Sequence, residues 1–330
     1  MIEEKRKWPY DFPLSPDYSH ANQRGALTGH LMIQDRYISK YVFPANSAYV
    51  GLAPPGEVGS WQMDSNGYQF WTRTNEHGYF NIKNIRPGTY NLYAWVPGIL
   101  GDYKFNDEIQ ISPGGQNSLK VLTFEPPRNG PTLWEIGIPD RTAAEFFIPD
   151  PNPGLRDHLY YTNHREKYRQ YGLWSRYTDI YPNGDLVYTV GKSDYGKDWF
   201  FAHVSRRVGQ GGRVTYAPTT WQIRFQLQNV NRRGIYTVRI ALASASYGVI
   251  EVRINDPKRQ RPNFGTDHIG DDNAIARHGI HGLYWLFSFQ VPGSELVEGA
   301  NTMYLMQSSN GGPFYGVMYD YIRLEGPGRN

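Results

Sequence analysis

Short apolar segments recur along this chain, and turn signals made of glycine, proline or asparagine separate them. In residues 78–92, apolar and polar side chains alternate on both sides of the turn Arg86-Pro87-Gly88. Alternation with a period of two is typical of a strand that buries one face, and a Pro-Gly turn between two such runs indicates a hairpin. With 35 Gly and 23 Pro among 330 residues, the sequence argues against a helical bundle and predicts an all-β fold.

The expected strands fall into two blocks. An extended lead-in, residues 1–24, contains prolines that disfavour a helix, and the first block follows it over 25–125. Its seven expected strands are 27–33, 48–53, 69–74, 79–82, 89–96, 108–112 and 119–124. The Pro-rich stretch 125–130 indicates a linker, and the second block covers 131–330. Its expected strands are an opening one around Glu135, then 186–190, 199–204, 220–226, 236–243, 249–254, 283–291, 302–306 and 314–324.

Composition excludes several classes of function. The chain has 34 Lys and Arg against 31 Asp and Glu, and a net charge of +3 is too small to favour a nucleic-acid partner. No run of about 18 apolar residues is present, so we expect no membrane span. The charged, Pro-broken beginning predicts no signal peptide in this chain. Because the chain has no Cys, it has no disulfide, thiol nucleophile or zinc site with Cys ligands.

One candidate ligand-binding loop contains Arg277, His278, His281 and Tyr284. Two imidazoles, a guanidinium and an aromatic ring on a Gly-bearing loop have the groups needed to hydrogen-bond and stack on a ligand. The alternative is a packed loop whose His side chains bond to backbone carbonyls. A zinc site is less favoured, because the spacing places no third ligand.

A second candidate is the pair Lys197 and Trp199, where charge and aromatic ring lie side by side in the sequence. A sugar offers apolar C–H faces for stacking and hydroxyls for charged partners, so this composition suits sugar recognition. The alternative is a turn followed by a core strand. No two acidic residues are paired by spacing for acid–base catalysis, and the sequence predicts no catalytic residue.

Seven stretches together resemble the plant-type rhamnogalacturonan lyases of polysaccharide lyase family 4. They are residues 22–25, 48–56, 88–98, 132–141, 197–203, 277–285 and 318–327, and they extend over nearly the whole chain. The resemblance implies a fibronectin-III-like β-sandwich followed by a carbohydrate-binding-like jelly roll. It also implies that the family's catalytic domain, which precedes these two, lies outside this chain. The family reaction is β-elimination in the pectic polysaccharide rhamnogalacturonan I.

The resemblance leads to three hypotheses. The first is an accessory module without catalytic activity that binds the acidic pectic polysaccharide, rhamnogalacturonan I. The second is an active lyase that uses the loop with Arg277, His278 and His281, and the third is a structural module with no ligand of its own. No cofactor is required in any of them, and family resemblance places the protein outside the cell or in the cell wall.

A structural calcium ion is a further expectation, because jelly-roll carbohydrate-binding modules often hold one between their first and last strands. The candidate ligands are Glu135, in the opening strand, and Asp320, in the closing strand. Calcium takes six to eight oxygen ligands, so backbone carbonyls and water would complete the set. The alternative pairs Glu135 with Arg141 or Arg323 and lets Asp320 accept backbone N–H groups.

Overall fold

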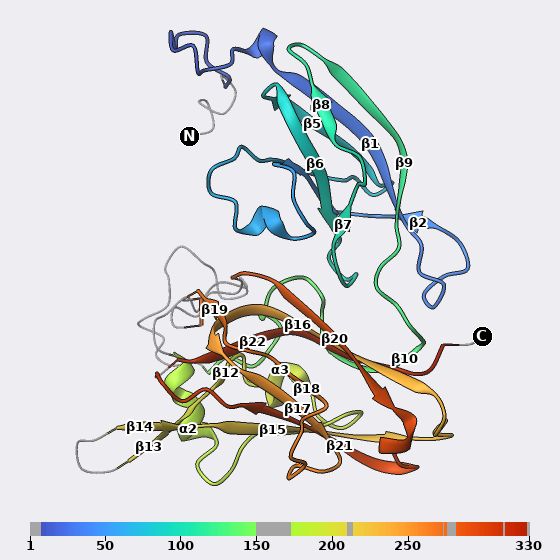
Figure 1. The fold of residues 1–330 in the computed structure, drawn as a ribbon, viewed down its shortest axis with the longest axis vertical. Helices are drawn as coiled ribbons and strands as arrows, with labels where there is room; N and C mark the ends of the chain where they lie inside the picture. Colours follow the sequence, from blue (N-terminus) through green and yellow to red (C-terminus); the bar gives the residue numbers. More distant parts are fainter. Residues whose placement is uncertain are drawn as a thin grey trace. The chain divides into compact units, whose positions relative to one another are not determined.

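The computed structural model describes residues 8–149, 173–209, 214–272, 274–275, 282–312 and 314–328. The chain divides into two compact units, residues 1–127 and 128–330, and both are built from strands (Figure 1). The prediction of an all-β fold is therefore confirmed. The helices are single turns: η1 (Ala21–Gln23), η2 (Ser60–Gln62), η4 (Leu173–Arg176), α2 (Tyr177–Ile180), α3 (Tyr195–Asp198) and η5 (Gly293–Glu295). In the part of the chain that the structure describes, no helix is long and apolar enough to cross a membrane.

The first unit consists of two sheets around one core. One sheet contains β1 (Gly25–Ile33), β2 (Phe43–Pro44), β5 (Tyr79–Ile85) and β9 (Gln116–Phe124). The other contains β3 (Tyr49–Ala53), β4 (Phe70–Arg73), β6 (Gly88–Trp95), β7 (Tyr103–Lys104) and β8 (Ile109–Ile111). Alternate residues of β1, such as Leu27 and Leu31, are fully buried against Val50 and Leu92. This is the sandwich arrangement that alternating sequence predicts.

The turn at Arg86-Pro87-Gly88 does not make a hairpin, so that prediction is wrong. β5 pairs with β1, whereas β6 pairs with β3, and the turn carries the chain from one sheet to the other. Asn84 adopts a left-handed conformation (φ 58°) just before this turn. Alternation reports that each strand buries one face, but it does not report which strand lies beside it.

The second unit has two larger sheets, drawn as two layers in Figure 1. One contains β10 (Thr132–Gly137), β12 (His203–Val204), β16 (Ile235–Gly248), β19 (Ile269–Asp271), β20 (Trp285–Pro292) and β22 (Gly316–Glu325). The other contains β11 (Val187–Thr189), β15 (Thr219–Leu227), β17 (Ile250–Ile254), β18 (Phe264–Gly265) and β21 (Gly299–Gln307). Trp199, Trp221 and Tyr319 lie buried in the core of the unit, with ring centroids 5.1–5.9 Å apart.

The expected strand at 199–204 is mostly absent. Asp194 caps α3 by accepting the amide of Gly196 at 2.9 Å, and β12 begins only at His203. Trp199, Phe200 and Phe201 are nevertheless almost completely buried. An apolar run of this length indicates burial, but it does not distinguish a strand from irregular chain packed into a core.

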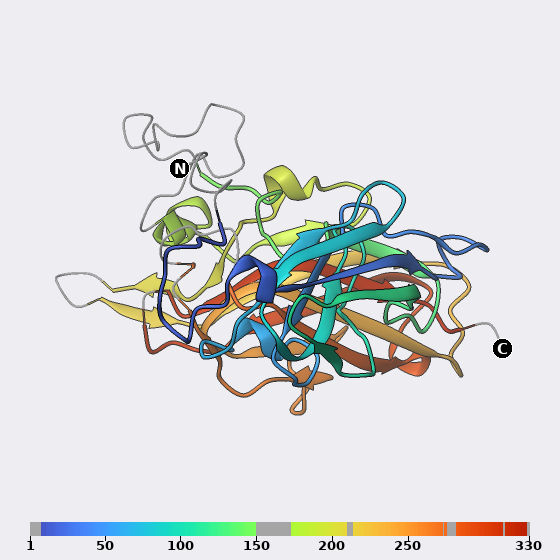
Figure 2. The ribbon, with the colours of Figure 1, turned by 90° about the horizontal axis from the view of Figure 1, so that it is seen from above.

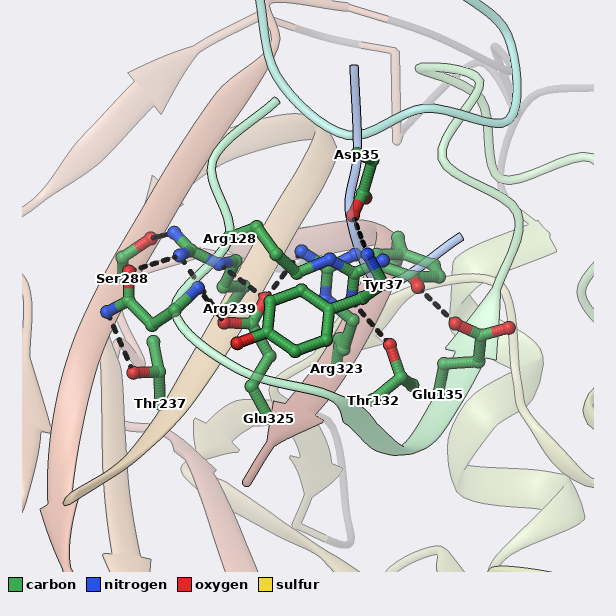
Figure 3. A network of polar contacts seen from close by, with 12 residues as sticks. Asp35, Tyr37, Arg128, Thr132, Glu135, Thr237, Arg239, Ser288, Arg323 and Glu325 are labelled. Carbon is green, nitrogen blue, oxygen red and sulfur yellow. Dashed lines mark hydrogen bonds and ion pairs between the residues drawn. The ribbon is translucent and has the colours of Figure 1, made fainter. Parts of the chain in front are cut away.

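Charged side chains of β16 and β22 form a polar network, shown in Figure 3. Glu325 Oε1 accepts a hydrogen bond from Arg239 Nε at 2.9 Å and forms an ion pair with Arg323 Nη2 at 2.6 Å. Arg239 also donates to Ser288 Oγ at 2.8 Å. Because Arg239 and Arg323 are directly opposite each other in the ladder, one carboxylate lies between two cations that would otherwise repel. The network stabilises the pairing of these two strands.

A short hairpin projects from the second unit in both views (Figures 1 and 2). It consists of β13 (Arg206–Val208) and β14 (Thr215–Ala217), which pair with each other and with no other described strand. A two-stranded ribbon of this length is only marginally stable by itself. Its position therefore depends on the contacts that its first strand makes with the chain around α2.

Candidate functional site

A small hollow lies where the β13–β14 hairpin meets η4 and α2. Its volume is about 160 Å³, and its walls are aromatic, hydroxyl-bearing and cationic: Trp174, Ser175, Thr178, Ser205, Arg207, Val214 and Tyr216. All of these residues belong to the second unit. Mixed aromatic and polar walls around a concave surface are typical of ligand sites.

The hairpin ladder sets the neighbours of Arg207. Arg207 lies directly opposite Tyr216, so the two side chains leave the same face of the ribbon. The Arg207 amide donates to Thr178 Oγ1 at 3.1 Å, which fixes the strand against α2. Trp174, in η4 just before α2, packs on Phe314 with ring centroids 5.8 Å apart. The hairpin and η4 therefore bring a guanidinium and two aromatic rings around one hollow.

Arg206 anchors the base of the hairpin. Its guanidinium donates to the carbonyls of Tyr181 and Gly184 at 2.6 Å each and to Asp185 Oδ1 at 2.7 Å. The same Asp185 oxygen accepts the Tyr177 hydroxyl at 2.9 Å, and Tyr177 accepts the Trp221 indole N–H at 2.9 Å. This chain of hydrogen bonds links the rim of the hollow to the buried core.

Arg207 carries the charge of the hollow. Within the described residues, its guanidinium has no ion-pair or hydrogen-bond partner, in contrast to that of Arg206. The indole N–H of Trp174 is buried and also has no hydrogen-bond partner there. A guanidinium forms bidentate bonds to carboxylates, and an aromatic ring stacks on the C–H face of a sugar. These groups can therefore pair with a carboxylate and stack on the apolar face of a ring.

His203 lies behind the hollow, in the core. Its ring stacks on Trp221 with centroids 4.0 Å apart, and its Nδ1 lies 3.0 Å from the Tyr319 hydroxyl. Burial lowers the pKa of His203 to about 3, because the charged imidazolium would lose its hydration. This imidazole is therefore neutral at physiological pH and contributes packing rather than charge.

The structure separates Lys197 from Trp199. Lys197 lies in α3, is 80% exposed and faces Asp194 at 3.3 Å, so its ammonium is accessible to a ligand. Trp199 is completely buried and packs on Trp221. Because the Trp199 ring has no face at the surface, the prediction that Trp199 contacts a sugar is wrong. The alternative, that Trp199 is a core residue, is correct.

Of the predicted loop, the structure describes Tyr284. Its ring lies under the Arg141 guanidinium, 4.2 Å from the ring centroid, and only 8% of the residue is exposed. Arg277, His278 and His281 lie outside the described residues. Their role in glycan binding stays a prediction.

The two candidate calcium ligands have different hydrogen-bond partners. Glu135 lies opposite Arg323 in the ladder and accepts the hydroxyl of Tyr321, so its side chain shares a face with those two residues. Asp320 lies at a break in the register between β22 and β16, and its partners differ from those of Glu135. Its Oδ1 accepts the amides of Asp140 and Arg141 at 3.0 and 2.7 Å.

Asp320 is the more unusual of these carboxylates. Burial raises its pKa well above the ordinary range, and its Oδ2 has no hydrogen-bond partner among the described residues. No group of three or more metal-binding side chains occurs in that part of the chain. A structural calcium ion held by Glu135 and Asp320 stays a prediction, tested by comparing melting temperatures in calcium and in chelator.

The sequence contained a signal for Arg207 and Tyr216 that the strand pattern above did not use. Both flank the sequence pair Gly211-Gly212, and a Gly-rich stretch between short polar runs is typical of a hairpin. A hairpin places them opposite each other. Trp174 had no comparable signal, because only tertiary packing brings it to the same hollow.

Comparison with known families accounts for most of the chain. A model of polysaccharide lyase family 4, domain III, matches residues 132–324, which include the hollow. A model of domain II of the same family matches residues 45–119 in the first unit. The domain II match corresponds to the fibronectin-III-like fold, and the domain III match corresponds to the carbohydrate-binding-like fold.

Relatives with a similar sequence are longer than this chain. A rhamnogalacturonate lyase from Dickeya dadantii is 27% identical over 326 residues, 97% of this chain and 47% of its own length. Rhamnogalacturonate lyase B from Emericella nidulans is 27% identical over 339 residues, which cover 93% of this chain and 49% of the relative. The chain thus spans about half the length of these curated relatives.

Proposed function

The chain belongs to polysaccharide lyase family 4, and on this basis we propose that it acts as an accessory module that binds the acidic polysaccharide rhamnogalacturonan I. Domains II and III are the parts of the family that match it. Such a ligand lies in the plant cell wall, so the proposed place of action is extracellular.

One observation supports this proposal most directly: the guanidinium of Arg207, which has no partner among the described residues, lies beside Trp174 and Tyr216 in a hollow of about 160 Å³. A galacturonate residue carries one carboxylate and an apolar C–H face. The carboxylate would pair with Arg207, and the C–H face would pack on an aromatic ring. Lys197, in an exposed position on α3, adds a second cation that a polymer could reach.

Calorimetric titration with rhamnogalacturonan oligosaccharides tests the proposal. We expect Arg207→Ala to weaken binding about tenfold or more, since a charge-assisted bond of about 1.5–3 kcal/mol is lost. Arg261→Ala is the matched control, because Arg261 is an exposed arginine away from the hollow. Equal losses in the two variants would mean that only net charge matters, and the site would be rejected.

Lyase activity is the second candidate function, and the basic residues Arg277, His278 and His281 motivate it. β-Elimination needs a base near the C5 proton of galacturonate and a cation near its carboxylate. Each elimination leaves an unsaturated uronate that absorbs ultraviolet light. Robust release of such products by the purified chain would favour the enzyme over the accessory module.

A further inference from the structure

A second concave surface lies in the same unit, where four strands begin or end. β10 and β16 begin there, and β15 and β22 end there. The groove has a volume of about 540 Å³, and its walls include Leu133, Gln226, Gln228, Asn229, Tyr236 and Pro327. That volume is within the range of about 300–1,000 Å³ usual for small-molecule sites.

The groove differs from the Arg207 hollow in charge. The Tyr236 phenol is the one ionisable side chain among its described lining residues, and its hydroxyl already accepts the Asn231 amide at 3.0 Å. A carboxylate that entered this groove would meet no cation among the lining residues, so it would gain no ion pair in exchange for the water it loses. The lining therefore favours an uncharged sugar over an acidic one.

The polar groups of the groove are primary amides. Gln226, Gln228 and Asn229 are exposed, and their side-chain amides form no hydrogen bond within the described residues. Each amide offers two N–H donors and one carbonyl acceptor. Sugar hydroxyls also donate and accept, so they match amides in both roles. Leu133, 43% exposed, and Pro327 add apolar surface for C–H groups.

From these features we infer that the groove is a second glycan site, specific for uncharged sugar residues. The inference rests on the proposed function, since it takes the ligand to be a polysaccharide. The two sites would then bind different residues of a mixed polymer. Arg207 would bind uronate residues, and the side-chain amides of Gln226 and Gln228 would bind neutral residues.

Titration with uncharged tetrasaccharides of galactose, arabinose and glucose, followed by NMR, tests the inference. We expect at least one of them to bind the full chain and to shift the side-chain NH₂ signals of Gln226 and Gln228. The double variant Gln226→Ala/Gln228→Ala should weaken that binding about tenfold. Gln290→Ala, an exposed amide on β20 outside the groove, is the matched control and should bind like the wild type.

The variants separate the two sites. Arg207→Ala should leave neutral-sugar binding unchanged, and the double Gln variant should leave binding of a galacturonate oligomer unchanged. The groove assignment is overturned if none of the three neutral probes binds, or if the double variant binds them like the wild type. Loss of galacturonate binding alone would count against the proposed function and leave the groove assignment standing.

Discussion

Arg206 and Asp185 form an ion pair with 2.7 Å between Nη2 and Oδ1, and this contact joins the projecting hairpin to the chain that follows α2. About four-fifths of each side chain is removed from solvent. Asp185 also accepts the Thr220 amide at 2.7 Å and the Tyr177 hydroxyl at 2.9 Å. One carboxylate therefore holds the hairpin, the short helix and β15 in register around the hollow.

Replacing Asp185 should loosen the hollow and lower stability. We expect Asp185→Ala to reduce the free energy of unfolding by about 1–3 kcal/mol, because several donors lose their acceptor. Binding of galacturonate oligomers should weaken as well, although Asp185 does not line the hollow. Urea denaturation measures the first effect and calorimetry the second.

Asp179→Ala is the control for this experiment. Asp179, on α2, pairs with Arg176 of η4, but the Asp179 side chain is 71% exposed. An exposed pair contributes at most about 1 kcal/mol, so stability should change little. Equal losses of stability in the two variants would contradict the proposal that Asp185 holds the hairpin, α2 and β15 together.

His203 should make stability depend on pH in the acidic range. Its pKa is about 3 in the folded chain and 6.5 when unperturbed, so between these values the unfolded chain takes up the proton more readily. The free energy of unfolding should therefore decrease as pH falls below about 6.5, by about 1.4 kcal/mol per pH unit from this residue.

His203→Gln should flatten that dependence, since an amide does not titrate. His268→Gln, at an exposed histidine, should leave the slope as in the wild type. Urea midpoints measured between pH 4 and pH 7 provide the comparison. An unchanged slope in His203→Gln would show that this imidazole is not the group responsible.

Trp199 should affect stability and not ligand affinity. Because its ring is completely buried in the core, Trp199→Ala should cost about 3–5 kcal/mol. The milder Trp199→Phe keeps the fold available for binding experiments. A folded Trp199→Phe protein with weakened glycan binding would contradict the assignment of Trp199 to the core.

Tyr216 separates stacking from charge in the hollow. Tyr216→Ala should weaken binding of a galacturonate oligomer several-fold while preserving its salt dependence, because the ring contributes contact area and no charge. Arg207→Ala should instead remove most of the salt dependence, since added salt screens the ion pair that this variant lacks. Titrations at low and high salt distinguish the two effects. Identical salt dependence in both variants would contradict the separate roles.

The sequence pattern predicts which residues of a strand are buried. It predicts less well which strand lies beside another in a sheet. The seven strands expected in the first unit are all present, because alternation directly reports a buried face. The strands that pair with β5 and with β6 were not predictable, since the Pro-Gly turn between these two strands crosses from one sheet to the other. Residues 199–202 are buried without forming a strand, because the helical turn α3 extends to Asp198 and β12 begins only at His203.

The same limit applies to the candidate sites. Charge next to an aromatic ring in the sequence selected Lys197 and Trp199, but one of them is exposed and the other is core. Arg207, Trp174 and Tyr216 come together through a hairpin and a helical turn that are separate in the sequence. The groove with Gln226 and Gln228 consists of strand ends, which pairing order alone brings into proximity.

Binding of the intact chain to rhamnogalacturonan I, compared with the same polymer after reduction of its carboxyl groups, tests the central claim most directly. If a guanidinium recognises the uronate carboxylate, the native polymer should bind and the reduced polymer should bind at least about tenfold more weakly. Equal affinity for the two polymers, or no affinity for either, would contradict the account.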